Sequence, residues 1–304
     1  MLQSSRTPIL FDVSLRDGIQ CANKNDYPLS KKIEVFENIL RTYNPDKFEI
    51  GSLTNPKILP IMSDTLDLFN HICREHPELK ERNYVLIPSI NKLTQAIENN
   101  IQNFSFITSV SESFQKKNTN KTIQEVKEDF KNVFQILCRE PLQNSNTKLY
   151  ISCINICPIQ GKIDNDFIIN ELFEYYTDFS FDELCISDTC GELLFNDFRY
   201  IITESIKKGI PASKFSIHLH NSFTLSQSLR ETAWQHLPLS LINVECLKNI
   251  ENIKQIIEFS FSIGINKFDV SYLETGGCSV TMGSKKIKSN LNYDFFIFNN
   301  NYVK

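Results

Sequence analysis

The chain alternates short apolar runs with longer stretches in which apolar residues recur at helical spacing. Runs that are apolar almost throughout are typical of strands buried on both faces, and the longer spacing is typical of amphipathic helices. The pattern predicts eight strands, over residues 9–14, 47–52, 83–89, 104–110, 148–154, 183–188, 215–220 and 267–273. It predicts helices over residues 31–43, 64–76, 91–100, 122–140, 165–176, 195–209 and 252–264.

The order of these elements indicates the fold. Each predicted strand except the last is followed by a helix, and repeated βα units favour a parallel sheet. Eight such units in 304 residues fit an α/β protein of the (β/α)₈ TIM-barrel type better than an open doubly wound sheet. No linker rich in Pro, Gly or Ser interrupts the pattern, so residues 1–304 are expected to form a single domain.

Composition and charge exclude several classes of partner. The formal net charge is -4 and the isoelectric point is about 5.8, without the basic excess that nucleic-acid binding favours. No run reaches the roughly 18 apolar residues of a membrane span, and the first residues lack the apolar segment of a signal peptide. The nine cysteines include no CxxC pair, which predicts reduced and mostly buried thiols. We therefore expect a cytoplasmic protein with no nucleic-acid and no membrane partner.

Polar residues gather where the predicted strands end, which in a (β/α)₈ barrel is the face that carries the chemistry. In strand order, these residues are Arg16, Asp17 and Gly18, then Glu49, then Asp188 and Thr189, then His218 and His220, and finally Gly276, Gly277 and Cys278. We expect them to meet at one rim of the barrel.

The segment His218 to Asn221 is the strongest local signal for a metal site. Residues two apart on a strand point to the same face, so both imidazoles can bind one divalent ion. Asp17 would complete a set of two histidines and one carboxylate with open positions. Such a set suits Mg²⁺ or Mn²⁺ and can also hold Zn²⁺ or Fe²⁺. The alternative is a pair of ordinary strand histidines without a ligand.

Arg16 and Cys278 each have two interpretations. Arg16 and Asp17 could form a surface ion pair of little value, or the aspartate could bind metal while the guanidinium faces a developing oxyanion. Gly18 is expected to let the backbone turn there. Cys278 could be a packing residue, but a thiol next to two glycines is hard to bury and can act as an acid or base. For Cys153 and Cys157 a structural role is the simpler expectation.

Several segments in the same order resemble one family. FDVSLRDGIQ at residues 11–20 resembles the Arg-Asp-Gly signature of the metal-dependent lyase and Claisen-condensation barrels, the DRE-TIM metallolyases. Further segments are similar to the 3-hydroxy-3-methylglutaryl-CoA lyases of that group, namely residues 111–125, 150–163, ISDTCG, IHLHNS and VSYLETGGC. The similarity runs from about residue 9 to residue 291.

The resemblance implies a metal-dependent cleavage of 3-hydroxy-3-methylglutaryl-CoA to acetyl-CoA and acetoacetate. It implies that the divalent cation is held by Asp17, His218, His220 and Asn290. It also implies that Arg16 stabilises the enolate, that Cys278 is the general acid or base, and that the site is shaped by Glu49, Asp188 and Thr189. The phosphates of an acyl-CoA substrate favour basic residues at the mouth, for which Lys24, Lys116 and Lys117 are candidates.

The chain departs from the family pattern at several places. Ser279 and Val280 replace the expected proline-aromatic pair, and Asn290 lies twelve positions after Cys278, a few more than in the family. Extra sequence occupies residues 222–249 after the seventh strand, and the C-terminus is shortened. An apolar patch left open on the first and last strands would need a partner subunit, as in a homodimer. The alternatives are a sibling enzyme acting on a 2-oxo or hydroxy acid, or a catalytically impaired homologue.

Overall fold

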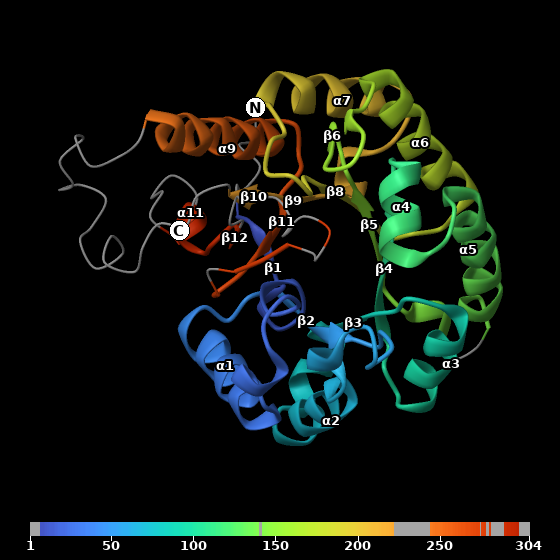
Figure 1. Ribbon diagram of the computed structural model, residues 1–304, viewed down its shortest axis with the longest axis vertical. Helices are drawn as coiled ribbons and strands as arrows, with labels where there is room; N and C mark the ends of the chain where they lie inside the picture. The colour runs from blue at the N-terminus through green and yellow to red at the C-terminus, as the bar shows by residue number, and fades with distance from the viewer. Residues whose placement is uncertain are drawn as a thin grey trace.

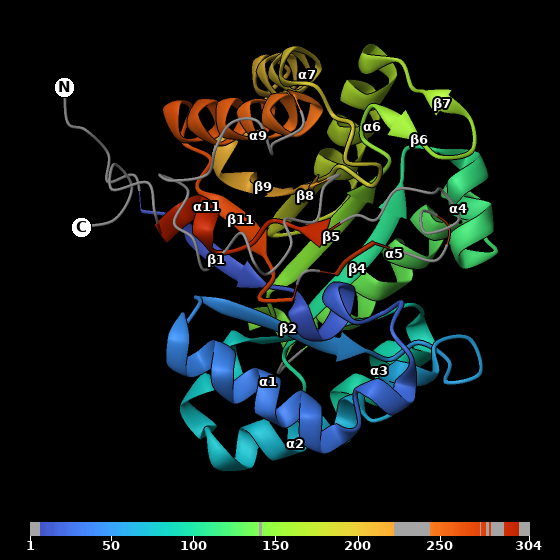
Figure 2. The same ribbon diagram turned by 60° about the vertical axis from the view of Figure 1, so that its left-hand side comes forward.

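The computed structural model describes residues 7–139, 142–221, 244–273, 275–277, 280 and 289–297. Its centre is a closed barrel of parallel strands with helices around it (Figure 1, Figure 2). The barrel strands are β1 (Ile9–Asp12), β2 (Lys47–Ser52), β3 (Asn83–Leu86), β4 (Asn103–Ser109), β5 (Thr147–Ser152), β8 (Glu183–Ser187), β9 (Phe215–His218) and β11 (Lys267–Val270). They follow chain order around the ring, and β1 closes it by pairing with both β2 and β11. All eight predicted strands and the TIM barrel are thus confirmed.

The helices mostly agree with the predicted ranges. They are α1 (Leu29–Thr42), α2 (Thr65–Glu75), α3 (Ile90–Glu98), α4 (Glu112–Thr119), α5 (Ile123–Leu137), α6 (Asn165–Asp178), α7 (Phe195–Lys207), α9 (Val244–Ser262) and α11 (Asp294–Ile297). Helical turns are η1 (Ser14–Gly18), η2 (Lys24–Asp26), η3 (Pro60–Met62), η4 (Pro77–Arg82), η5 (Leu142–Asn144) and η6 (Ala212–Lys214). Helix α4 was not predicted, and α9 begins eight residues before the predicted start at 252. None of the described helices is long and apolar enough to cross a bilayer.

Most of the core lies between the strands and the surrounding helices. A cluster of aromatic rings shows this on one side, where Phe106 of β4 meets Phe130 of α5 at 6.0 Å and Phe181 at 5.8 Å. Inside the barrel the packing is different, because Phe11 and Tyr84 stack edge to face beside charged side chains. Apolar burial therefore holds the helices to the strands, while the barrel interior also carries polar groups.

Two short antiparallel pairs lie outside the barrel. Strands β6 (Ile156–Cys157) and β7 (Gly161–Lys162) form a hairpin that stands on the same side as α4 (Figure 2). Strands β10 (His220–Asn221) and β12 (Ser289–Asn290) pair so that His220 faces Asn290. This second pair brings the C-terminal part of the described chain back to the end of β9. Of the expected insertion over 222–249, residues 222–243 lie outside the described residues.

The segment 289–297 covers the faces of β1 and β11. Phe296 packs on Phe268 of β11 at 5.0 Å, and Tyr293 stacks at 4.0 Å on Tyr43, the residue that follows α1. The Tyr293 hydroxyl also donates a hydrogen bond to Asp12 Oδ2 of β1 at 2.7 Å. The expected exposed apolar patch on these strands is therefore wrong for the described residues, because the chain's own return segment fills the place of an eighth barrel helix.

Candidate active site

Arg16 and Asp17 lie on η1, the turn that follows β1 at the rim. Asp12 at the end of β1 starts this turn, since its carboxylate accepts hydrogen bonds from Ser14 N and Oγ, both at 2.9 Å. Gly18 is not in a left-handed conformation; a Cβ there would lie 3.1 Å from Ser271 Oγ. Gly18 lies in the turn as expected, but the turn does not require a left-handed residue. The absence of a side chain there makes room for the chain that follows β11.

Asp17 is buried and accepts several hydrogen bonds. Its Oδ1 accepts from Arg16 Nη1 and Gln20 Nε2, both at 2.6 Å, and its Oδ2 accepts from Gly277 N at 3.0 Å. Burial raises the pKa of Asp17, but the Arg16 guanidinium and the two rim histidines outweigh it and hold the pKa well below its usual range. Asp17 is therefore a carboxylate, as a metal ligand must be.

His218 and His220 both present Nε2 to Asp17. Their Nε2 atoms lie 4.0 Å and 3.4 Å from Asp17 Oδ2, and both rings are buried. Each Nδ1 is occupied: His218 Nδ1 donates to Asp269 Oδ2 at 3.0 Å, and His220 Nδ1 donates to the carbonyl of Asp188 at 2.8 Å. A neutral histidine that donates from Nδ1 keeps a lone pair on Nε2. One possible ligand atom from each of the three residues lies within 4.8 Å of the others.

Asn290 adds an observation that points to a missing ligand. Its backbone pairs with His220, and its side chain lies against Gly276, where a Cβ would come within 2.6 Å of Asn290 Nδ2. Both Oδ1 and Nδ2 of Asn290 are buried without a hydrogen-bond partner among the described residues. Buried polar atoms are rarely left unpaired. An amide oxygen on the strand that pairs with His220 could join two imidazoles and a carboxylate as a ligand of a divalent cation.

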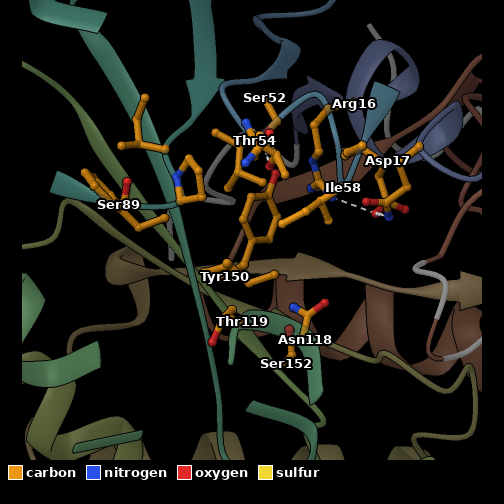
Figure 3. Close-up of a pocket in the computed structure, with 18 of the residues that line it drawn as sticks. Arg16, Asp17, Ser52, Thr54, Ile58, Ser89, Asn118, Thr119, Tyr150 and Ser152 are labelled. Carbon is orange, nitrogen blue, oxygen red and sulfur yellow. Dashed lines mark hydrogen bonds and ion pairs between the residues drawn. The ribbon is translucent and has the colours of Figure 1, made fainter. Parts of the chain in front are cut away.

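Arg16 is held from two sides. Glu49 Oε2 of β2 accepts from Arg16 Nε at 2.5 Å and from the Tyr150 hydroxyl at 3.0 Å. The guanidinium also lies 4.7 Å above the centre of the Tyr150 ring. Figure 3 shows Arg16, Asp17 and Tyr150 pointing into a common cleft. Glu49 does not line that cleft, so its part in the site is to orient Arg16.

Asp188 and Thr189 have different surroundings. The Asp188 carboxylate accepts from the backbone N–H groups of Glu192 at 3.1 Å and Leu193 at 3.2 Å, and its carbonyl orients His220. It thus organises the loop after β8 and does not line the cleft. Thr189 does line the cleft, and its hydroxyl accepts from Cys153 N at 2.8 Å.

The cleft is a cavity of about 1370 Å³ that extends from Asp17 and the histidines toward α4. Lys24 and Lys117 line it, as do Lys92 and Lys121, which the sequence reasoning missed. Lys116 is not among the residues that line it; its ammonium lies 3.5 Å from Glu112, one turn earlier on α4, in an exposed pair. A cavity of this size can take a large substrate.

Of the three cysteines discussed above, the structure describes two, Cys153 and Cys157. Cys278 lies outside the described residues, although its neighbour Gly277 donates to Asp17. Cys153 and Cys157 are buried, and Cys157 Sγ accepts a hydrogen bond from Ser111 Oγ at 3.0 Å. Their burial agrees with the expected structural role.

Sequence reasoning missed three side chains that surround the site. Tyr150 supports Arg16, Asp269 accepts from His218, and Lys148 forms an ion pair with Asp269. The sequence carries a partial signal, since Lys148 and Asp269 are charged residues inside predicted strands, but it does not show that they pair.

Comparisons with known proteins agree with this geometry. Residues 7–236 match the family model described as HMGL-like. The chain is 26% identical over 275 residues to the cytoplasmic 3-hydroxy-3-methylglutaryl-CoA lyase of Rattus norvegicus, covering 90% of this chain and 69% of the relative. It is 25% identical over 217 residues to the 3-hydroxy-3-isohexenylglutaryl-CoA/hydroxy-methylglutaryl-CoA lyase of Pseudomonas aeruginosa, covering 70% and 68%.

A solved structure shows the same fold. The HMG-CoA lyase of Acinetobacter baumannii, in complex with coenzyme A and 3-methylmalate, superposes with a TM-score of 0.74 at 21% identity. The match covers 96% of this chain and 82% of the other. Because the family model spans well over half of the sequence, the chain belongs to the HMGL-like family.

Proposed function

We propose that this protein is a metal-dependent carbon–carbon lyase that cleaves 3-hydroxy-3-methylglutaryl-CoA, or a similar 3-hydroxyacyl-CoA, to acetyl-CoA and a 3-oxo acid. The observation that carries the proposal is the convergence of Asp17, His218 and His220 beside Arg16 at the buried end of one cleft. The names of the curated relatives, which are lyases of such thioesters, support the same substrate class.

The divalent cation is held by Asp17, His218, His220 and Asn290. This set mixes carboxylate and amide oxygens with imidazole nitrogens, and we favour Mg²⁺ or Mn²⁺ as the ion. When bound, the cation supplies Lewis-acid chemistry to oxygens of the substrate. The unpartnered amide of Asn290 supports its place as the fourth ligand.

Arg16 stabilises the negative charge that develops when the carbon–carbon bond breaks. Cleavage leaves an enolate of the acetyl thioester, and a fixed cation facing its oxygen lowers the barrier. Arg16 Nε and Nη1 are held by Glu49 and Asp17, so the remaining edge of the guanidinium has a fixed direction. Tyr150 keeps the guanidinium plane against the cleft wall.

Cys278 is the acid that protonates the new carbanion, or the base that removes the hydroxyl proton. Its neighbour Gly277 donates its N–H to Asp17, so the described chain just before Cys278 contacts the ligand set. Both proton transfers are needed to balance the cleavage, and a thiol on a loop can carry out either.

The acyl-CoA enters along the cleft, with Lys24 and Lys117 facing its phosphates. Lys116 is the weakest of the three lysine candidates because of its pair with Glu112. The cytoplasmic relatives support a cytoplasmic location. A homodimer stays a prediction for gel filtration to test, since the described faces of β1 and β11 are covered within the chain.

The test is a substrate panel with the purified protein. We expect acetoacetate from 3-hydroxy-3-methylglutaryl-CoA in the presence of Mg²⁺ or Mn²⁺, and its loss when EDTA is added. The panel also holds the isohexenyl analogue named for the Pseudomonas relative and several 2-oxo acids. Turnover of 2-oxo acids alone would show a sibling enzyme, and no turnover of any substrate would show an impaired homologue.

A further inference from the structure

The buried carboxylate of Asp269 lies behind one of the candidate metal ligands. It projects from β11 into the barrel, where its Oδ2 accepts the Nδ1 hydrogen of His218 at 3.0 Å. This contact holds the ring with Nε2 directed toward Asp17. In a neutral imidazole only one nitrogen carries a proton, so the partner of Nδ1 decides whether Nε2 is free to bind a metal.

Lys148 fixes the other oxygen of the same carboxylate. Its ammonium forms an ion pair with Asp269 Oδ1 and a second with Glu183 Oε1 at 2.9 Å. Burial lowers the pKa of Lys148, but Asp269 and the neighbouring acidic groups outweigh it and hold the pKa above its usual range. An ammonium has only donors, so Asp269 must present an acceptor to it. One oxygen of Asp269 is therefore always committed to Lys148.

Lys148 itself is confined by its surroundings. It is 2% exposed at its side chain, and its ammonium lies 4.1 Å from the centre of the Phe11 ring and 5.0 Å from that of Tyr150. Three successive contacts therefore cross the barrel interior. They lead from Glu183 to Lys148, then to Asp269, and finally to His218. This path starts where β8 begins and reaches the rim where β9 ends.

We propose that Asp269 is a positioning residue that fixes the metal-binding tautomer of His218, and that Lys148 holds Asp269 in the orientation this requires. The proposal rests on the ligand set proposed above. It adds two residues, on β5 and β11, that touch neither the substrate nor the cation.

The first test uses the wild-type protein without metal. Imidazole ¹⁵N NMR at pH 8, assigned with the His218→Ala variant, reports which nitrogen of His218 is protonated. We expect Nδ1 to carry the proton and Nε2 to be free. A neutral His218 with its proton on Nε2 and none on Nδ1 would overturn the proposal without any need for a folded Asp269 variant.

The second test replaces Asp269 by its neutral isostere. In Asp269→Asn, Lys148 still requires an acceptor, so the amide oxygen stays with Lys148 and the NH₂ group faces His218. Nδ1 must then accept, which moves the proton to Nε2 and weakens metal binding. We expect the tautomer to reverse and Mn²⁺, titrated alone, to bind roughly 10- to 100-fold more weakly. Unchanged Mn²⁺ affinity in a folded variant would overturn the proposal.

A control and a double variant separate positioning from a structural role. Asp182→Asn changes a carboxylate at the opposite end of the barrel, where Oδ2 accepts from Thr147 N at 2.8 Å, and should leave Mn²⁺ affinity unchanged. Lys148→Met combined with Asp269→Asn removes both charges together, which limits the cost of burying either alone. The asparagine can then turn its oxygen to His218.

We therefore expect the double variant to bind Mn²⁺ at least fivefold more tightly than Asp269→Asn, with Nδ1 protonated again. A double variant that binds no better than the single one would overturn the part assigned to Lys148. Because these measurements use metal alone, they stay informative if acetoacetate formation fails, whereas a failed lyase assay bears only on the proposed reaction.

Discussion

The barrel interior holds two clusters of charge that differ in balance. In the rim cluster, the guanidinium of Arg16 faces two carboxylates, Asp17 and Glu49. The two rim histidines add no charge in the neutral form that binds a metal. In the inner cluster, near the strand starts, three ammonium groups face two carboxylates; its members are Lys47, Lys148, Lys267, Glu183 and Asp269. With its histidines in that form, the rim has an excess of negative charge and the inner end does not.

This difference indicates what each cluster is for. A buried excess of negative charge is costly unless a cation compensates it, and the unpaired amide of Asn290 lies at the same place. The inner cluster needs no ligand, because its carboxylates already face ammonium groups. In barrels of this type, residues at the strand ends serve catalysis and those at the strand starts serve stability. We therefore expect rim variants to lose function. Inner variants should lose stability, and among them only those at Lys148 and Asp269, which reach His218, should also lower metal affinity.

The largest expected effect is at His218. His218→Ala removes an imidazole from the candidate ligand set, and we expect turnover to fall by on the order of 10³-fold or more, since the cation's contribution is several kcal/mol. Titration with Mn²⁺ should show the loss of tight binding. His71→Ala is the matched control, because that histidine lies on α2, outside the cleft, and contacts Arg74. Unchanged metal affinity in His218→Ala would remove His218 from the ligand set.

Glu183 gives the corresponding test of the inner cluster. Burial raises its pKa, but Lys148, Lys47 and Lys267 outweigh it and lower the pKa from 4.5 to about 2. Because the folded pKa is the lower one, the stabilisation is complete above pH 4.5 and is lost as the pH falls toward 2. The shift corresponds to about 3 kcal/mol in the free energy of unfolding. Urea unfolding between pH 5 and about pH 2 should show this slope in the wild type and not in Glu183→Gln.

A control for Glu183 uses a carboxylate at the surface. Glu204 pairs with Lys207 on α7, and both side chains are exposed. Exposed pairs of this kind contribute little to stability. Glu204→Gln should therefore keep the acid-dependent loss of stability that Glu183→Gln lacks. Equal slopes in Glu183→Gln and the wild type would show that the inner cluster does not stabilise the fold in this way.

The barrel was predictable because its strands are buried on both faces and so appear as unbroken apolar runs. Helix α4 was not predictable from its sequence, ESFQKKNT. Only Phe114 and Gln115 are buried there, and apolar residues do not recur at helical spacing. The hairpin β6–β7 was missed because strands of two residues carry no pattern. Packing with neighbouring elements decides such segments: Ser111 at the start of α4 bonds to Cys157 and Gln160 of the hairpin.

The candidate site was predictable in outline for a geometric reason. Residues that end parallel strands must meet at one rim, so Asp17, His218 and His220 could be grouped before their distances were known. Lys148 and Asp269 could not be grouped in this way, because their pairing depends on which residues lie at the same level inside the closed barrel. Asn290 was predicted from the family resemblance alone, because its place depends on the pairing of β12 with β10, which brings together residues 70 positions apart.

A smaller effect is expected at Asn290. Asn290→Ala removes one proposed ligand and two unpartnered polar atoms, so we expect Mn²⁺ affinity to fall about tenfold while stability in the absence of metal is maintained. Asn103→Ala is the inner counterpart, because Asn103 donates to the carbonyl of Glu81 at 3.0 Å and accepts from Asn146 Nδ2 at 2.8 Å. That variant should lose about 1–3 kcal/mol of stability and keep its Mn²⁺ affinity. If Asn290→Ala lost stability instead, its amide would be structural.

The smallest effect is expected at the outer edge of the cleft, where charge acts through solvent. Lys117 lines the cleft and Lys116, its neighbour on α4, does not, so the two form a matched pair. In Lys117→Ala we expect the KM for the CoA thioester to rise roughly two- to fivefold with little change in kcat, because exposed charge pairs contribute up to about 1 kcal/mol. The difference should shrink at high salt, since ions screen such interactions. Lys116→Ala should keep the wild-type KM. Equal effects of the two variants would show that the field of α4 as a whole attracts the phosphates, and that the cleft wall at Lys117 does not bind them.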